Sequence, residues 1–400
     1  MSLNYLIVQI ARWSCDPPSR GISLATGRKW KENRQFTIKA LARLGVADRS
    51  VESRIVREVD SLLSVMATVD SHLFNPAVIC SCIANVMCDI IFGRRYAHDD
   101  PEMMKYVAEM QEGFVLMAHL GILNFLPALR HLPMTRKPLA RLNVTKAAAH
   151  SFFANHVREH MATFDPENIR DFIDTYLEEA RKRAQVDANC NLLEDDYVLH
   201  LVGDLFGSGF VTTAHTIIWG LLYMSRHGDV QRRVQAEIGE QIGEGRAPNL
   251  ADMSELPYTV AVVHEVLRFK TVAPLGVPHA NTKDLVVRGY HIPKGTFIMP
   301  LLHAVHHSEM HWKNPTEFDP TNFLDSDGRL KIPSAFMPFS SGKRICPGGQ
   351  LAMYETFLFL ASILQRFTVT LPEGAPVPDL IGKLGVTLAP PTFDLLITAR

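Results

Sequence analysis

The chain lacks the features that mark several specialised classes of protein. Its 41 Lys and Arg residues nearly balance 42 Asp and Glu, and the net charge of -1 gives no reason to expect a nucleic-acid partner. No repeat, low-complexity tract or linker divides the 400 residues, so we expect one domain over residues 1–400. The opening stretch, MSLNYLIVQI, is too short for a membrane span and has no signal-peptide pattern, so we expect no membrane anchor in this chain.

A paired cysteine framework is also missing. The six cysteines show no disulfide-type spacing, and Cys80, Cys82 and Cys88 lie in an apolar stretch without a second pair of metal ligands. We therefore expect buried thiols there rather than a zinc site, and a reducing, cytosol-facing environment. What the chain does have is 47% hydrophobic residues, which is enough to bury a large core.

The pattern of apolar residues predicts a mainly α fold with a small β module. Before residue 270, apolar spacings of three and four predict helices over residues 30–45, 53–70, 76–92, 102–119, 142–161, 167–184, 194–226, 228–243 and 255–269. From residue 271 to 302, Pro, Gly and β-branched residues predict short strands and turns. The end, GVTLAPPTFDLLITAR, predicts a last hairpin.

One cysteine differs from the others in its surroundings. Cys346 lies in FSSGKRICPG, residues 339–348, beside Lys343 and Arg344, and nearby cations favour a thiolate over a thiol. The following stretch is apolar almost all round and predicts a buried helix with Pro347 in its first position. Cys346 would then face the unpaired amides and the positive dipole end of that helix. The sequence therefore predicts a site for a stable thiolate.

The longest helical segment permits two interpretations. LFGSGFVTTAHTIIWGLLYM, residues 205–224, contains no Asp, Glu, Lys or Arg, so its length allows a transmembrane span. Gly207 and Gly209 need a separate reason, since glycine inside a helix costs about 1 kcal/mol relative to alanine. Either a bulky group lies flat against this helix or another helix packs closely there.

A third feature is the pair Glu265 and Arg268 in HEVLRF, one helical turn apart. On a surface such a pair adds only roughly 0.2–0.5 kcal/mol. Apolar residues surround this one, so we expect the pair to be buried and to recover its desolvation through further hydrogen bonds. Its expected role is to fasten chain segments together rather than to take part in chemistry.

Together the three features resemble the cytochrome P450 family of haem-thiolate monooxygenases. The loop 339–348 matches the family's haem-ligand loop, F-x-x-G-x-R-x-C-x-G, at every fixed position. Glu265 and Arg268 match the family's buried helix pair, and Gly209 and Thr212 match its oxygen-binding helix. The order and spacing of the three motifs agree as well.

Longer stretches are similar to the animal microsomal branch of the family, which handles drugs, steroids and fatty acids. They are WKENR at 30–34, FDPENIRDFIDTYL at 164–177, VPHANTKDLVVRGYHIPKGT at 277–296 and EFDPTNFLDSDG at 317–328. The resemblance covers about residue 21 to residue 400. It implies the cytochrome P450 fold without its N-terminal helices and first sheet strands, whose loss would leave a sheet edge open.

The resemblance implies haem b as the cofactor, with Cys346 as the axial ligand of the haem iron. A thiolate ligand favours cleavage of the O–O bond. The haem propionates would be held by four side chains, those of Trp30, Arg34, His279 and Arg344. For Trp30 and Arg34 an ordinary helix face is the alternative.

The resemblance also assigns roles to residues around the iron and the oxygen site. Phe339 would pack beside the sulfur, and Gly342 and Gly348 would let the backbone approach the porphyrin. Gly209 and Thr212 would line the oxygen site. There the Thr212 hydroxyl would hold a water that delivers a proton, as in general-acid catalysis.

The implied activity is insertion of one oxygen atom from O2 into an apolar small molecule. Electrons would come from an NADPH-dependent flavoprotein reductase, with cytochrome b5 as a second candidate donor. The expected location is the cytosolic face of the endoplasmic reticulum membrane, where membrane association rests on the resemblance alone. The basic run GRKWKENRQFTIKALAR is either a solvated face or the surface on which the reductase docks.

Two positions depart from the family pattern. Val211 stands where Asp or Glu usually precedes the oxygen-helix threonine, which removes the ionisable member of the proton relay. We therefore expect much of the consumed NADPH to appear as hydrogen peroxide, and Val211→Glu to restore coupling if its side chain reaches solvent. The missing carboxylate also favours two alternative activities, a peroxide-driven reaction and an isomerase-like reaction. The other departure is Asn322, where many members carry an Arg that joins the buried pair.

Three alternatives stay open. The chain could be a truncated haem-binding form with little or no monooxygenase activity that competes for the reductase. It could be an all-helical membrane protein that uses residues 205–224 as a span. The histidines of HAVHHSEMHW could bind a metal, although no carboxylate stands between them in the HExxH sense; they are His303, His306, His307 and His311.

Overall fold

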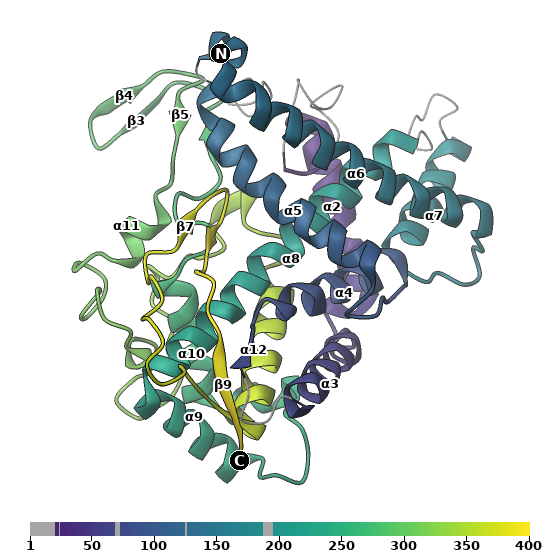
Figure 1. Ribbon diagram of the computed structural model, residues 1–400. Coiled ribbons are helices and arrows are strands. Elements are labelled where there is room, and N and C mark those ends of the chain that lie inside the picture. The colour runs from purple at the N-terminus through teal and green to yellow at the C-terminus, as the bar shows by residue number, and fades with distance from the viewer. Residues whose placement is uncertain (1–20, 24, 69–72, 125, 187–194) are drawn as a thin grey trace.

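The computed structural model describes residues 21–23, 25–68, 73–124, 126–186 and 195–400 (Figure 1). The helices before residue 270 are α2 (Gly27–Leu41), α3 (Glu52–Thr68), α4 (Val78–Phe92), α5 (Pro101–His119), α6 (Pro133–Thr163), α7 (Phe172–Val186), α8 (Asp195–Arg226), α9 (Gly228–Gln241) and α10 (Pro257–Phe269). Later come α11 (Leu302–His306) and α12 (Gly349–Arg366). Short 3-10 or π-helical turns are η1 (Ala42–Val46), η2 (Leu120–Asn124), η3 (Pro127–His131), η5 (Leu250–Ser254), η6 (Pro320–Phe323) and η7 (Gly342–Arg344). The predicted mainly helical architecture is confirmed.

Two helices begin away from their predicted starts. α6 begins at Pro133 rather than at residue 142, and Pro138 lies inside it. A proline inside a helix removes one backbone hydrogen bond, and the helix predicted over residues 142–161 does not include Pro138. α7 begins at Phe172 rather than at residue 167, because the chain first turns at Asp165, whose carboxylate accepts from the Glu167 amide at 3.0 Å.

The strands form a small β module at the C-terminal side of the helices. They are β1 (Leu73–Phe74), β2 (His279–Ala280), β3 (Leu285–Val287), β4 (Tyr290–Ile292), β5 (Phe297–Ile298), β6 (Phe367–Thr370), β7 (Lys383–Leu384), β8 (Leu388–Ala389) and β9 (Leu395–Ala399). β2 pairs with β5, β3 with β4 and β7 with β8, all antiparallel. The three-stranded sheet has the order β1-β9-β6.

The predicted last hairpin over residues 385–400 is wrong in its pairing. β9 pairs with β6, with Val369 opposite Ile397, and with β1, whereas β8 pairs back on β7. Pro390 and Pro391 separate β8 from β9. Because proline donates no hydrogen bond and disfavours a tight strand return, this segment crosses to another sheet.

α8 is the central helix of the fold, between the helices α2–α7 on one side and the β module on the other (Figure 1). It is long and apolar enough to cross a membrane, but 83% of its apolar window is buried inside the protein. A Cβ on Gly209 would lie 2.6 Å from the Met87 Cε of α4, and one on Gly207 would lie 3.1 Å from the Met110 Cε of α5. Helix packing therefore accounts for both glycines, and the burial favours a core helix over a span.

The pair Glu265 and Arg268 is buried, as predicted, with both side chains 0% exposed. The two side chains make two contacts of 2.6 Å. Arg268 also donates to three backbone carbonyls, those of His306 at 2.7 Å, Pro315 at 3.0 Å and Glu317 at 2.9 Å. The Asp319 amide donates to Glu265 at 2.8 Å. These bonds fasten α10 to α11 and to the segment 315–319, so the expected fastening role is confirmed.

We predict that Glu265→Ala destabilises the protein by about 3–5 kcal/mol, because it leaves the Arg268 charge buried without its carboxylate. Haem incorporation should fall with it. Thermal unfolding and the haem-to-protein ratio measure the two effects. Asn322→Ala is the matched control, since Asn322 bonds only to the nearby Asp319 carbonyl, at 3.0 Å, among the hydrogen bonds of the described residues. Normal melting and haem content in Glu265→Ala would contradict the prediction.

Candidate functional site

The segment that holds Cys346 is a loop closed by its own backbone. The Cys346 amide donates to the Phe339 carbonyl at 3.0 Å. α12 begins at Gly349 with Gly348 as its N-cap, so the prediction that Pro347 takes the first helical position is wrong. The predicted and observed starts differ by two residues, and the amides of Gly348 and Gly349 lie near the sulfur, where they lower the pKa of the Cys346 thiol. Cys346 still precedes the helix and faces its free amides.

Two loop glycines have different reasons to be glycine. Gly342 has a φ of 76°, a left-handed conformation that favours glycine. Gly348 has an ordinary φ of -94°, and a Cβ there would meet no protein atom within 4 Å. Neither strain nor a protein neighbour requires glycine at Gly348. A flat group lying against the loop would require it, as the resemblance implies for a porphyrin.

The protein alone does not stabilise a thiolate at Cys346. One side of the residue is exposed, but the loop crowds the sulfur, and this desolvation raises the pKa of the thiol above its ordinary value. The amides of Gly348 and Gly349 and the charge of Arg34 lower the pKa by less. The predicted stable thiolate is therefore wrong for the protein alone. A coordinated metal ion deprotonates a thiol outright, so a bound iron would supply the missing stabilisation.

α2 is tied to the Cys346 loop by two arginines. The Arg344 guanidinium lies 3.9 Å from the ring centre of Trp30 and donates to the Ala25 carbonyl at 2.9 Å. Arg34 donates to the carbonyl of Ile345, the residue before the cysteine. The structure thus brings three of the predicted propionate-binding residues to one place beside the loop. They do not form an ordinary solvated helix face.

Two predicted propionate donors have a ring nitrogen without a hydrogen-bond partner among the described residues. The Trp30 Nε1 and the His279 Nδ1 atoms are buried, and neither has a hydrogen-bond partner in the described part of the chain. Buried N–H groups nearly always have an acceptor, so these two atoms point to an acceptor that the protein does not provide. Carboxylates of a bound group would satisfy them. The residues present therefore fit a haem held by its iron at Cys346 and by its propionates at Trp30, His279 and the two arginines.

The predicted oxygen-site residues come from α8, which packs against α12. Thr212 is partly exposed and donates its hydroxyl to the Ser208 carbonyl at 2.7 Å. Close packing against α4 is enough to explain the glycine at position 209. A role of Gly209 in the oxygen site stays a prediction. Val211 is 0% exposed in the hydrophobic core. The condition that a carboxylate at this position reaches solvent is not met, and Val211→Glu should destabilise the core instead of restoring coupling.

Sequence reasoning missed Glu355, an acidic residue in the apolar helix that follows Cys346. Glu355 is 1% exposed on α12, and its Oε1 has no partner among the described residues. Burial raises the pKa of Glu355 to about 8, and a hydrogen bond with Thr213 of α8 opposes the shift. Most of the carboxyl is therefore neutral at pH 7. Its partner Thr213 directly follows Thr212 in α8. No sequence signal distinguishes it from a packing position.

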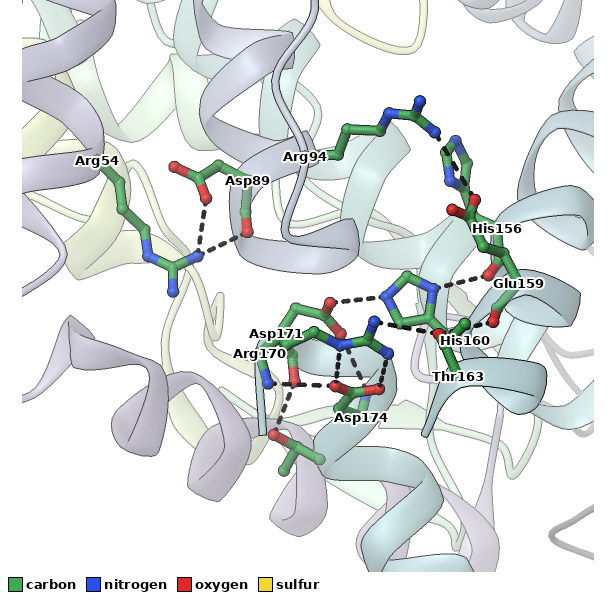
Figure 2. A network of polar contacts seen from close by, with 11 residues as sticks. Arg54, Asp89, Arg94, His156, Glu159, His160, Thr163, Arg170, Asp171 and Asp174 are labelled. Carbon is green, nitrogen blue, oxygen red and sulfur yellow. Dashed lines mark hydrogen bonds and ion pairs between the residues drawn. The ribbon is translucent and has the colours of Figure 1, made fainter. Parts of the chain in front are cut away.

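A second polar cluster joins α6 to α7 (Figure 2). Ligand atoms of His160, Asp171 and Asp174 lie within 4.8 Å of one another. A cation is already present there, because Arg170 holds Asp174 with bonds of 2.6 and 2.8 Å, while Asp171 accepts from His160 at 2.7 Å. Burial opposes a charge on His160, but the bond and charge of Asp171 outweigh it and raise the pKa of the imidazole. The cluster is a structural ion network rather than a metal site.

A cysteine before a buried helix, cations around it and unpartnered donors for carboxylates define a haem-thiolate protein. The comparisons agree. The family model of cytochrome P450 matches residues 9–397. Cytochrome P450 2U1 of Rattus norvegicus is 36% identical over 377 residues, which is 94% of this chain and 71% of that protein. Cytochrome P450 2D6 of Homo sapiens is 37% identical over 392 residues, which is 96% of this chain and 77% of that protein.

The chain belongs to the cytochrome P450 family. It is therefore a monooxygenase, an oxidoreductase that incorporates oxygen from O2, and its cofactor is haem b. The predicted family, fold class, enzyme class and cofactor are confirmed. The roles of the individual residues remain predictions.

We predict that Cys346→Ala abolishes the red-shifted Soret band of the reduced, carbon monoxide-bound protein. Thiolate ligation produces that band, and the thiols of Cys80, Cys82 and Cys88 are buried in α4, where burial raises their pKa values. Cys80→Ala is the matched control and should keep the band. A red-shifted band that survives in Cys346→Ala would show that another residue holds the iron.

Proposed function

We propose that the protein inserts one oxygen atom from O2 into an apolar small molecule, a xenobiotic, steroid or fatty acid, using electrons from an NADPH-dependent flavoprotein reductase. Cytochrome b5 is a second candidate donor. We further propose that it acts on the cytosolic face of the endoplasmic reticulum membrane, as the microsomal resemblance implies. The observation that carries the proposal is the set of buried, unpartnered donors Trp30 Nε1 and His279 Nδ1 together with Arg34 and Arg344.

Bound haem supplies the redox centre for oxygen activation, and the residues of the chain hold it and manage charge and protons. Arg34 and Arg344 would neutralise the propionates, Trp30 and His279 would offer them hydrogen bonds, and the loop amides of Gly348 and Gly349 face the sulfur. Thr212 has a partly exposed hydroxyl on α8, which would order water for proton delivery. Its hydroxyl proton is engaged with Ser208, so the oxygen lone pairs are free to accept from that water.

The basic surface of α2 supports docking of an acidic electron donor. Lys31 and Lys39 of α2 and Lys343 of the cysteine loop are all exposed. Arg34 joins α2 to Ile345, so these cations lie on the elements that hold the thiolate ligand. Positive charge steers an acidic partner to the surface and raises the association rate. Electrons delivered there would have a short path to the ligand loop.

We predict that Lys31→Glu or Lys343→Glu lowers the rate of reduction by the flavoprotein roughly threefold or more at low ionic strength, because each reverses a steering charge. The effect should shrink as salt screens the surface. Stopped-flow reduction at several salt concentrations measures it. Lys383→Glu, a reversal of an exposed charge on β7, is the matched control. Equal rates in all four proteins would rule out docking on this surface.

We predict that NADPH consumption by the wild type is poorly coupled to product formation. Much of the NADPH consumed with reductase should appear as hydrogen peroxide, because Val211 provides no carboxyl for proton delivery. Thr212→Ala should raise the share of NADPH that appears as peroxide further and lower the product formed per NADPH, while peroxide-supported turnover suffers less. Product and peroxide formed per NADPH are the measurements. Thr216→Ala is the control, since its buried hydroxyl only bonds back to the Thr212 carbonyl at 2.9 Å.

Three outcomes separate the alternatives. Tight coupling of NADPH consumption to product formation in the wild type would show that another group supplies the proton. It would contradict the predicted release of peroxide. A red-shifted Soret band without NADPH consumption or product would identify a haem-binding form with little or no monooxygenase activity. Product with peroxide but none with reductase and NADPH would identify a peroxide-driven enzyme.

A further inference from the structure

His306 belongs to the histidine-rich stretch after β5, and no role in the haem site assigned above uses it. The residue ends α11 and is 0% exposed. Its imidazole packs against aromatic rings, with the Phe336 ring centre at 5.9 Å and the Trp312 ring centre at 6.1 Å. A histidine buried among aromatic rings must satisfy both ring nitrogens within the protein.

Both ring nitrogens of His306 are satisfied, and the partners fix the position of the proton. The Met337 amide donates to Nε2 at 3.0 Å, so Nε2 is an acceptor without a proton. Nδ1 therefore carries the proton and donates to the Thr271 hydroxyl oxygen at 2.6 Å. That hydroxyl in turn donates to the Leu267 or the Arg268 carbonyl, at 3.0 or 2.9 Å.

The imidazole stays neutral at physiological pH. Burial, the Arg268 charge and the neighbouring histidines lower the pKa of His306 to about 3. A protonated ring would present an N–H to the Met337 N–H and break the chain of bonds. The low pKa keeps the acceptor available over the whole range in which the enzyme works.

The chain of bonds leads from the buried ion pair to the cysteine loop. Arg268 donates to the His306 carbonyl at 2.7 Å, so the pair holds the backbone of the residue whose ring holds Met337. The Met337 carbonyl accepts from the Ser340 amide at 2.9 Å, and the Phe339 carbonyl accepts from the Cys346 amide at 3.0 Å. Met337, two residues before the loop 339–348, is thus held from outside by His306, whereas Arg34 holds the loop itself at Ile345.

We propose that His306 is a positioning residue for the haem-ligand loop, which transmits the fixed position of α10 and α11 to Met337 and from there to Cys346. It touches neither substrate nor iron. It acts as a neutral imidazole with a fixed tautomer, which donates a hydrogen bond to Thr271 and accepts one from Met337. A merely space-filling residue would leave the Met337 amide without an acceptor.

The test compares His306→Leu, His306→Gln and the neighbouring control His307→Leu in the haem-loaded protein and in the protein freed of haem. His307 lies beside His306 but packs against His303 and Phe269, and its Nδ1 bonds to the His303 carbonyl at 3.1 Å. The first readout is hydrogen exchange at the Met337 amide. The second is the fraction of reduced, carbon monoxide-bound protein with the red-shifted Soret band.

His306→Leu should speed exchange of the Met337 amide about tenfold or more, because a buried donor loses its acceptor. It should also increase the fraction with an unshifted Soret band. His306→Gln, which offers an acceptor at a similar reach, should recover part of both losses, and His307→Leu should match the wild type. If His306→Leu does not fold, Thr271→Val, which removes the partner of Nδ1, should give a smaller increase in exchange.

Several results would overturn the proposal. One is wild-type exchange and wild-type spectrum in His306→Leu. Another is an equal change in His307→Leu, which would indicate general destabilisation of α11. A lower melting temperature with an unchanged Soret band would show that His306 only supports the fold. If His306→Leu fails to fold, unchanged exchange in both His306→Gln and Thr271→Val would reject the proposal as well.

Discussion

The burial of one guanidinium constrains much of this structure. Arg268 is fully enclosed, so its charge and its N–H groups must all be met inside the protein. The Glu265 carboxylate balances the charge, and the carbonyls of residues 306, 315 and 317 accept hydrogen bonds from the remaining N–H groups. Because these carbonyls belong to separate turns, the path of the chain after α11 is set by what Arg268 requires. The Arg268 guanidinium also lies 5.2 Å from the ring centre of Trp312, which places the adjoining aromatic cluster.

The site depends on that frame through both backbone and side chains. Residues 315–323 lead into the segment that ends at the cysteine loop, and Phe323 and Phe336 pack in the cluster with Trp312. On the other side of the loop, α12 is buried against α8 and α10, which leaves the loop no freedom to slide along the core. Gly220 of α8 permits this approach, since a Cβ there would lie 3.0 Å from Leu360 of α12.

The features predictable from the sequence were those with a local signal. Apolar spacing located the helices, and the buried pair was visible because apolar residues flank Glu265 and Arg268. Features set by distant contacts were not visible. The partner of β9 depends on β6 and β1 far along the chain, the helical extension of α6 overrides Pro138, and the environments of Val211, Glu355 and His306 are fixed by neighbouring helices and loops. The propionate cluster was predictable only through resemblance, since Trp30 and His279 have no local pattern.

A single bound group would stabilise three features of the haem site. The thiol of Cys346 has a raised pKa, Trp30 and His279 hold unpartnered buried donors, and desolvation together with the nearby Arg34 charge lowers the pKa of Arg344. Carboxylates would satisfy the donors and neutralise the arginines, and a metal cation would stabilise the thiolate. A haem carries both groups in one rigid molecule. The unpartnered donors and the desolvated Arg344 charge cost stability, and the protonated Cys346 thiol lacks the charge of an iron ligand. A bound haem would therefore stabilise the folded protein at its donors and arginines and would hold the thiolate through its iron.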